Sequence, residues 1–341
     1  MDSSFRIRLE LKNLSVKFKS DDGDLLAVNK INLQVPASKT LCIVGESGCG
    51  KSVTVSSILK LHDPDSSSID GEIIYHQNDE DIFQINKMNS KSKEMQKIRG
   101  NEISMIFQEP MTALSPVHTV GDQICEMMRL HEKLSLRAAS ERAVTLLEKV
   151  GIPAPEKRFH LYPFQLSGGM RQRVMIAMAL SCHPQVLIAD EPTTALDVTT
   201  QSQILLLLKE LQDEYGMTII LITHDLGVVG EIADYVGVMY LGEMVEYGDV
   251  YTIFEKPIHP YTKDLLASVP TIDREWDQRL NAIQGSVPSL NQRPTGCCYH
   301  PRCLVRKKVC ENEVPNIYFD KINYHKVACI LADPHFQRGI D

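Results

Sequence analysis

The sequence has no long run of apolar residues. Its longest apolar stretches, such as Ile204–Leu208 and Ile219–Ile222, are far shorter than the roughly 20 residues that a membrane-spanning helix needs. The first residues, Met1–Arg6, also lack the basic and then apolar layout of a secretory signal. We therefore expect a protein that is soluble by itself and that, if it works at a membrane, docks on the helices of another protein.

The sequence also lacks an excess of positive charge. Its 36 Lys and Arg residues are outnumbered by 44 Asp and Glu residues, which gives a net charge of −8. Nucleic-acid binding depends on a basic surface that neutralises phosphates. We therefore expect no nucleic-acid partner. The 341 residues, 43% of them hydrophobic, suffice for one large domain with a smaller appendage or for two modest domains, and they contain no internal repeat.

Cysteine is distributed unevenly along the chain. Five of the nine cysteines lie in the last 45 residues. Without an export signal we expect a reducing compartment, where a group of cysteines indicates metal binding before it indicates disulfides.

Short apolar segments alternate with segments of helical periodicity. Thr40–Val44, Val186–Ala189 and Thr218–Ile222 are wholly or largely apolar, as strands of a parallel sheet covered on both faces are. Val120–Val150 and Gln203–Tyr215 repeat apolar residues at helical spacing. Alternating strands and helices predict an α/β fold.

Other segments flank this pattern. Leu9–Val16 alternates charged and apolar residues, which predicts a half-exposed strand, and two closing strands are expected at Val236–Met239 and Met244–Tyr247. Residues 62–102 are polar and patternless in places, so we expect a surface hairpin and loop there. The sequence becomes rich in Pro and Cys after about Lys256, where we place a domain boundary.

A glycine-rich segment follows the first buried strand. Residues 45–52 fit the pattern G-x-x-x-x-G-K-[ST], and the helix-like Val53–Leu61 comes next. In this setting the backbone N–H groups and the helix N-terminus cradle phosphates, Lys51 neutralises them and the Ser52 hydroxyl ligates Mg²⁺. A chance glycine-rich turn is the alternative, and the strand before and the helix after argue against it. The predicted nucleotide contacts are Gly45, Glu46, Ser47, Gly48, Cys49, Gly50, Lys51, Ser52 and Val53.

Two acids end the second buried strand. Asp190 and Glu191 follow Val186–Ala189 and would lie at the carboxyl end of a parallel strand, where α/β sheets bind ligands. Asp190 would hold Mg²⁺, and Glu191 would act as general base towards the attacking water. A solvated acidic turn is the alternative for an isolated Asp-Glu pair.

A second glycine-rich segment, Leu166–Met170, precedes the helix-like Val174–Leu180. Its Ser167, Gly168 and Gly169 would form a second anion-binding helix N-terminus. Since one nucleotide needs one such cradle, this surface is expected to close over a nucleotide held elsewhere.

With these motifs the chain resembles the nucleotide-binding subunits of ABC transporters over residues 5 to about 255. Leu166–Met170 is similar to the family signature LSGGQ, with Met170 in place of the glutamine. In that family two ATPase domains pair head-to-tail, and the signature of one covers the γ-phosphate held by the other.

The resemblance extends to four further residues in the family's order. Phe18 matches the aromatic that stacks on adenine, and Gln108 matches the glutamine that senses Mg²⁺ and links the core to the permease. Asp197 matches the loop that crosses the dimer interface, and His224 matches the switch histidine that contacts the γ-phosphate.

The segments Phe107–Pro116, Asp190–Val198 and His259–Leu265 resemble the bacterial oligopeptide and dipeptide importer ATPases, a group that also contains nickel importers. This resemblance implies two transmembrane permease subunits, a second and usually different ATPase subunit, and indirectly an extracytoplasmic peptide-binding protein. It also implies a peripheral position on the cytoplasmic face of the bacterial inner membrane.

The tail carries the family pattern of Gly-Cys-Pro-Phe-x-Pro-Arg-Cys, with Cys298 in place of the proline. In some members the cysteines at four positions, here Cys297, Cys303, Cys310 and Cys329, hold a [4Fe-4S] cluster. Four thiolates suit that cluster or a tetrahedral Zn²⁺ ion, and buried free thiols are the third possibility.

The expected architecture is therefore a P-loop α/β ATPase domain over residues 1–255, with an N-terminal antiparallel β portion and a helical subdomain near residues 110–180. A metal-stapled tail would follow at residues 256–341. A soluble ABC ATPase of DNA repair or translation is the rival from another class. It is disfavoured by the acidity of the chain, a single cassette and the lack of a long coiled coil.

Overall fold

The fold is described from a computed structural model, for residues 6–21, 23–109, 113–194, 196–269, 283–315, 317–320 and 324–333. The chain divides into two compact units. The first comprises Met1–Leu9, Val35–Lys39 and Ile74–Ile222, and the second comprises Glu10–Gln34, Thr40–Ile73 and Thr223–Asp341. Among the described residues, no helix combines the length and the hydropathy needed to cross a membrane.

Three parallel strands form the sheet of the first unit. β7 (Val186–Asp190) lies between β6 (Ile103–Ile106) and β8 (Thr218–Ile222). All residues of β7 and β8 are buried, as the apolar runs predicted. The predicted helix after β7 is confirmed as α8 (Val198–Tyr215), which starts five residues before the predicted Gln203 because Asp197 caps its N-terminus.

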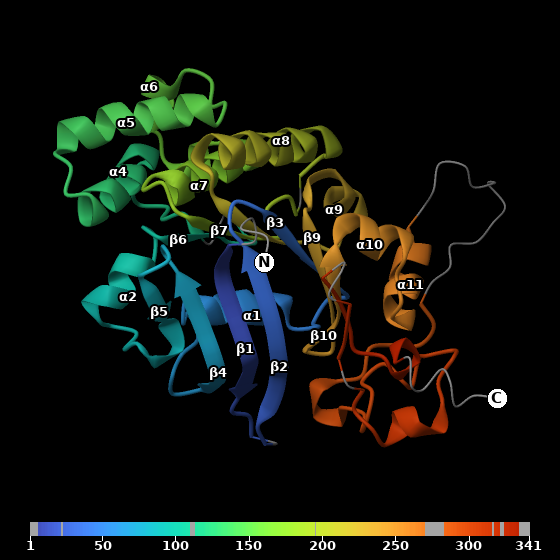
Figure 1. The fold of residues 1–341 in the computed structure, drawn as a ribbon. Helices are drawn as coiled ribbons and strands as arrows, with labels where there is room; N and C mark the ends of the chain where they lie inside the picture. The colour runs from blue at the N-terminus through green and yellow to red at the C-terminus, as the bar shows by residue number, and fades with distance from the viewer. Residues whose placement is uncertain are drawn as a thin grey trace. The chain divides into compact units, whose positions relative to one another are not determined.

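Four helices of the first unit pack together (Figure 1). They are α4 (Val120–His131), α5 (Leu136–Lys149), α6 (Pro155–Phe159) and α7 (Gly168–Leu180). The helical pattern predicted over Val120–Val150 is thus confirmed, but as two helices. The break arises because Ser135 caps a new helix, its side chain accepting a hydrogen bond from the Ala138 N–H.

The hairpin predicted within residues 62–102 is confirmed as an antiparallel pair of strands, whereas the prediction of loop for the rest of the segment is wrong in part. The segment contains β4 (Ser67–His76), β5 (Ile82–Gln84), η1 (Ile85–Lys87) and α2 (Lys93–Ile98). Five apolar side chains of the segment are buried in spite of the polar surroundings, namely Ile73, Tyr75, Ile85, Met95 and Ile98, whereas Ile82 on β5 is exposed. The Tyr75 hydroxyl donates to Glu102 over 3.0 Å, which lets a polar group be buried there.

The second unit contains both antiparallel and parallel strands. β1 (Ile7–Phe18) and β2 (Leu25–Pro36) are neighbours in one sheet, and β1 confirms the strand predicted at Leu9–Val16. β3 (Thr40–Val44) pairs in parallel with β9 (Tyr235–Tyr240), and β9 pairs antiparallel with β10 (Glu243–Asp249). The buried strand at Thr40–Val44 and both closing strands are therefore confirmed.

The tail belongs to this second unit and is more regular than its composition indicates. It follows α10 (Val250–Glu255) and contains α11 (Pro260–Ala267) and then the 3-10 helices η3 (Leu290–Gln292), η4 (Lys308–Glu311) and η5 (Ile330–Ala332). Two short strands extend the sheet, because β12 (His325–Val327) pairs antiparallel with β10 and β11 (Tyr318–Asp320) pairs antiparallel with β12. The tail is therefore built onto the edge of the ATPase sheet in this unit.

A buried carboxylate joins the tail to that edge. The Glu246 side chain on β10 is fully buried and pairs with Nε2 of His325 on β12 over 2.8 Å. It also accepts hydrogen bonds from the backbone N–H groups of Ile258 and His259. Because a buried carboxylate is tolerated only with such partners, Glu246 fixes both the start of α11 and the position of β12.

Candidate functional site

The glycine-rich segment forms a compact loop between β3 and α1 (Lys51–Ile58). Gly45 and Gly50 have φ angles of 152° and 96°, which only glycine adopts readily. A Cβ atom at Gly45 would lie 2.2 Å from the Met239 carbonyl oxygen, and one at Gly50 would lie 2.7 Å from the Ala27 carbonyl oxygen. The backbone can therefore follow this path only with glycine at these two positions.

Lys51 begins α1 and points back over the loop. Its side chain is buried, and Nζ donates to the carbonyl oxygens of Gly45 at 2.8 Å and Glu46 at 3.1 Å. The ammonium group thus lies inside the loop that the sequence assigned to phosphates. Among the other predicted contacts, Ser47 and Gly48 are exposed, Cys49 is buried, and Ser52 and Val53 are half-buried.

Phe18 ends β1 and is half-buried. Its ring meets that of His62 edge-on, with 5.2 Å between the ring centroids. His62 Nε2 in turn lies 3.1 Å from the carbonyl oxygen of Val53, in the first turn of α1. The predicted adenine contact is therefore connected to the phosphate loop through one side chain.

The acidic end of β7 lies in the first unit. Asp190 is buried, whereas Glu191 has left the strand with a φ angle of 44°, a left-handed conformation that costs a non-glycine residue about 1–2 kcal/mol. The Glu191 carboxylate accepts hydrogen bonds from Gln108 Nε2 at 3.1 Å and from the Thr194 hydroxyl at 3.0 Å. The structure thus brings together two of the predicted catalytic residues, Glu191 and Gln108. Strain of this kind persists where surrounding contacts impose it, and it is common at active sites.

The signature segment and the interface loop both cap helices of the first unit. The Ser167 hydroxyl accepts from the Met170 N–H and starts α7, with the exposed Gly168 next. The Asp197 carboxylate accepts from the Thr200 N–H at 2.9 Å and starts α8, and these bonds lower its pKa. Gly169 and Thr200 are close, since a Cβ atom on Gly169 would lie 3.2 Å from Thr200 Cγ2. Two predicted dimer-contact segments are therefore adjacent.

His224 follows β8 and precedes α9 (Leu226–Ile232). Its side chain is exposed, which suits a residue that contacts a ligand, and Asp225 beside it caps α9 by accepting from the Gly227 N–H. In the predicted interface loop before Asp197, Ala195 lies outside the described residues.

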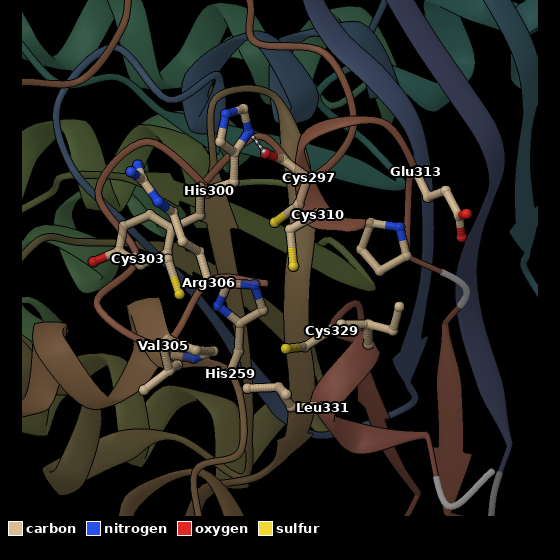
Figure 2. A pocket seen from close by; sticks show the side chains of 14 residues that line it. His259, Cys297, His300, Cys303, Val305, Arg306, Cys310, Glu313, Cys329 and Leu331 are labelled. Atoms are coloured by element: carbon tan, nitrogen blue, oxygen red, sulfur yellow. Dashed lines mark hydrogen bonds between the residues drawn. The ribbon is translucent and has the colours of Figure 1, made fainter. Parts of the chain in front are cut away.

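Four cysteines of the tail line one pocket (Figure 2). They are the four that the sequence singled out, namely Cys297, Cys303, Cys310 and Cys329. Cys298 does not line this pocket. Its side chain is buried, and its thiol lies 3.8 Å from the Tyr240 carbonyl oxygen. The structure thus separates Cys298 from the other four.

Burial disfavours the thiolate form of three cysteines in this pocket. Burial raises the pKa of Cys297 to about 11, and burial also raises the pKa of Cys303 and of Cys329. Within the described part of the chain, no three His, Cys, Asp or Glu side chains are grouped closely enough to hold a metal ion. The four cysteine sulfur atoms are soft ligands and line one pocket. They are not close enough together to coordinate a metal ion as they stand.

Two tail residues that no sequence motif singled out contact the phosphate loop. The Tyr261 hydroxyl accepts a hydrogen bond from the Glu46 N–H at 2.9 Å, and the Arg302 guanidinium pairs with the Glu46 carboxylate at 2.6 Å. Both lie in segments noted only for their family resemblance, His259–Leu265 and the Pro-Arg-Cys sequence at Cys303. Nothing in the local sequence indicated their partner.

The fold and sequence have close counterparts. The family description "ABC transporter" matches residues 28–194, and "Oligopeptide/dipeptide transporter, C-terminal region" matches residues 245–310. The dipeptide transport ATP-binding protein DppD of Bacillus subtilis is 47% identical over 97% of both chains. The oligopeptide transport ATP-binding protein OppD of the same organism is 49% identical over 96% of this chain and 89% of its own.

The chain belongs to the ABC transporter ATP-binding family. A solved dimeric structure of MJ0796, a bacterial ABC transporter cassette, superimposes with a TM-score of 0.62 at 30% identity, covering 71% of this chain and 98% of that one. The predicted P-loop α/β fold is therefore confirmed, and so is the resemblance to ABC ATPases with a peptide-transporter C-terminal region. Of the four pocket cysteines, Cys329 alone lies beyond the matched C-terminal region.

Proposed function

We propose that this chain hydrolyses MgATP to power the import of short peptides by an ABC transporter. The observation that carries the proposal is the presence of a phosphate loop, a strand ending in Asp190-Glu191 and a glycine-rich helix start in one chain, followed by the C-terminal region of peptide transporters. In this proposal residues 1–255 form the ATPase domain, with a helical subdomain near 110–180, and residues 256–341 form the C-terminal region.

The phosphate loop would bind the nucleotide. The N–H groups of the loop, except that of Glu46, which donates to Tyr261, and those of the first turn of α1 would surround the β-phosphate. Lys51 would exchange its carbonyl partners for phosphate oxygens. Ser52, Asp190 and Gln108 would hold Mg²⁺, which neutralises phosphate charge when it is bound. Phe18 would stack on the adenine.

Glu191 would act as the general base. Its carboxylate lies at the carboxyl end of β7 and is already oriented by Gln108 and Thr194. It would accept a proton from the attacking water, and His224 would contact the γ-phosphate. A base held in one orientation favours in-line attack because less freedom is lost in the transition state.

Two ATPase chains would share each nucleotide. Ser167, Gly168 and Gly169 of one chain would cover the γ-phosphate held by its partner, and Asp197 would lie at the interface. The exposed N-terminus of α7 and the dimeric state of the MJ0796 relative support this arrangement. The partner chain would be a second, usually different ATPase subunit.

The assembly would couple hydrolysis to two transmembrane permease subunits and indirectly to an extracytoplasmic peptide-binding protein. The chain would sit peripherally on the cytoplasmic face of the bacterial inner membrane. Peptide cargo is supported by the similarity to DppD, a dipeptide transport ATP-binding protein, and to OppD, an oligopeptide transport ATP-binding protein.

Cells that lack this chain are therefore expected to lose uptake of a labelled dipeptide or tripeptide, and the intact gene is expected to restore it. Uptake of radioactive nickel, measured in parallel, distinguishes a peptide importer from a nickel importer of the same group. Loss of nickel uptake with unchanged peptide uptake would replace the peptide assignment, while leaving the chain an ABC importer ATPase.

The cysteine pocket is a second part of the proposal. Cys297, Cys303, Cys310 and Cys329 would hold a [4Fe-4S] cluster, or less favourably Zn²⁺, because thiolates are the usual ligands of both. The common pocket and the exclusion of Cys298 support this set. Binding would require loss of the thiol protons and movement of the side chains, and it would link η4, the 297–303 loop and η5 into one structure.

Anaerobically purified protein is expected to be brown and to contain about four iron atoms per chain. Cys303→Ala should lose the colour and make the tail more sensitive to protease, whereas Cys298→Ala should keep the colour and serves as the matched control. Colourless protein with one zinc per chain would replace the cluster by zinc. If the tail is equally ordered after replacement of all four cysteines, neither a cluster nor a zinc ion stabilises it.

A further inference from the structure

We propose that Arg302 is a positioning residue of the phosphate loop, which it holds through Glu46, so that nucleotide affinity depends on the folded tail. The inference rests on the proposed function, because it concerns the loop assigned to ATP. It adds a residue 256 positions away in the sequence to the nucleotide site.

The contact between the two side chains is bidentate. Arg302 Nη1 donates to Glu46 Oε2 at 2.6 Å, and Nη2 donates to Glu46 Oε1 at 3.1 Å. The Arg302 side chain is 4% exposed and that of Glu46 is 27% exposed, so water screens the pair little. A buried bidentate pair of this kind fixes orientation as well as distance, which an exposed ion pair does not.

A second contact from the tail fixes the backbone at the same residue. The Tyr261 hydroxyl on α11 accepts from the Glu46 N–H at 2.9 Å. Both the carboxylate and the N–H of Glu46 therefore form hydrogen bonds with tail residues, so neither is available to bind a nucleotide. The Glu46 carbonyl oxygen remains, and it accepts from Lys51 Nζ at 3.1 Å. Glu46 is thus the residue through which the tail reaches the phosphate-binding lysine.

Residues of the tail and Tyr240 on β9 also hold Arg302 itself in place. Its Nε donates to the Gln284 carbonyl oxygen at 2.9 Å, and the guanidinium carbon lies 5.8 Å from the ring centroid of Tyr240 and 5.9 Å from that of Tyr299. The Tyr299 hydroxyl donates to Asp264 on α11. Because these partners are themselves packed, Arg302 cannot follow a shift of the loop without breaking several contacts.

Arg302 directly precedes Cys303, one of the pocket cysteines. Any change that loosens the loop around Cys303 therefore displaces the guanidinium that holds Glu46. Coupling of two sites through binding free energy is reciprocal, so bound nucleotide must also stabilise the tail.

The test measures MgADP affinity of the full-length chain by calorimetry. Arg302→Lys and Glu46→Gln each remove the bidentate charged pair with little change in volume, and each is expected to weaken binding roughly 5- to 150-fold, the usual range of such coupling. The two substitutions together should weaken binding no more than either alone, because they remove the same contact. Lys307→Ala, an exposed charge of the same tail, should bind MgADP as the unchanged chain does.

A second readout separates positioning from general damage. MgADP should slow proteolysis of the tail in the unchanged chain and in Lys307→Ala, but not in Arg302→Lys or Glu46→Gln, with thermal unfolding confirming that all four chains are folded. Unaltered affinity in folded Arg302→Lys and Glu46→Gln would overturn the proposal. Native affinity in Lys51→Ala would instead refute the nucleotide site itself, so the two failures are distinguishable.

Discussion

Glu191→Gln is expected to slow ATP hydrolysis by roughly 100- to 10,000-fold, the usual contribution of a general base. The amide keeps the size of the side chain and can still bond Gln108 and Thr194, so the φ angle of 44° at this residue and the end of β7 should persist. Binding of MgATP should be retained, because the phosphate loop is unchanged. The closed pair of ATPase chains should therefore accumulate.

The measurements are steady-state phosphate release, ATP affinity and the fraction of paired chains in size-exclusion chromatography with MgATP. Glu210→Gln on α8, an exposed residue of the same charge, is the matched control and should hydrolyse ATP normally. If Glu191→Gln hydrolyses ATP within a few fold of the normal rate, Glu191 is not the general base. His224→Ala would then be the next variant to examine.

Lys51→Ala is expected to weaken MgATP binding by roughly 30-fold or more, since truncating one partner of a buried, hydrogen-bonded charge pair costs about 2–5 kcal/mol. The buried Lys51 ammonium already lies inside the loop, where it donates to two carbonyl oxygens. A phosphate bound in the loop would therefore meet this ammonium without a rearrangement of the backbone. The loop glycines are untouched, and the fold should remain.

Calorimetry with MgATP measures this loss directly. Lys97→Ala, an exposed lysine of α2, controls for the change in net charge and should bind normally. Near-native affinity in a folded Lys51→Ala chain would show that residues 45–52 are not the phosphate site.

The sequence predicted the central strands well because their apolar runs have few alternatives. Thr40–Val44 and Thr218–Ile222 have the predicted bounds in the structure, and Val186–Ala189 is one residue longer. A wholly buried strand is encoded locally, by side chains that must leave water on both faces. The phosphate loop was predicted equally well from the sequence. Its Gly45 and Gly50 are required because backbone carbonyl oxygens lie where a Cβ atom would be.

Other features depend on contacts that no local pattern encodes. The buried Tyr75 hydroxyl donates a hydrogen bond to Glu102, a partner 27 residues away. The tail gains order from Glu246 on β10, which pairs with His325. The link from Arg302 to Glu46 joins two motifs that look independent in the sequence. Polar partners distant in sequence are specified by the folded geometry, and composition alone made these segments look like loops.

The central claim, that this chain converts ATP hydrolysis into peptide import, is tested most directly in liposomes holding the complete transporter. The measurement is phosphate release with and without the peptide-loaded receptor on the outside, together with the accumulation of labelled peptide inside. We predict that the loaded receptor stimulates hydrolysis, that peptide accumulates only with MgATP, and that Glu191→Gln in this chain strongly reduces both. Peptide accumulation that proceeds equally without ATP, or hydrolysis that is indifferent to the loaded receptor, would contradict the account.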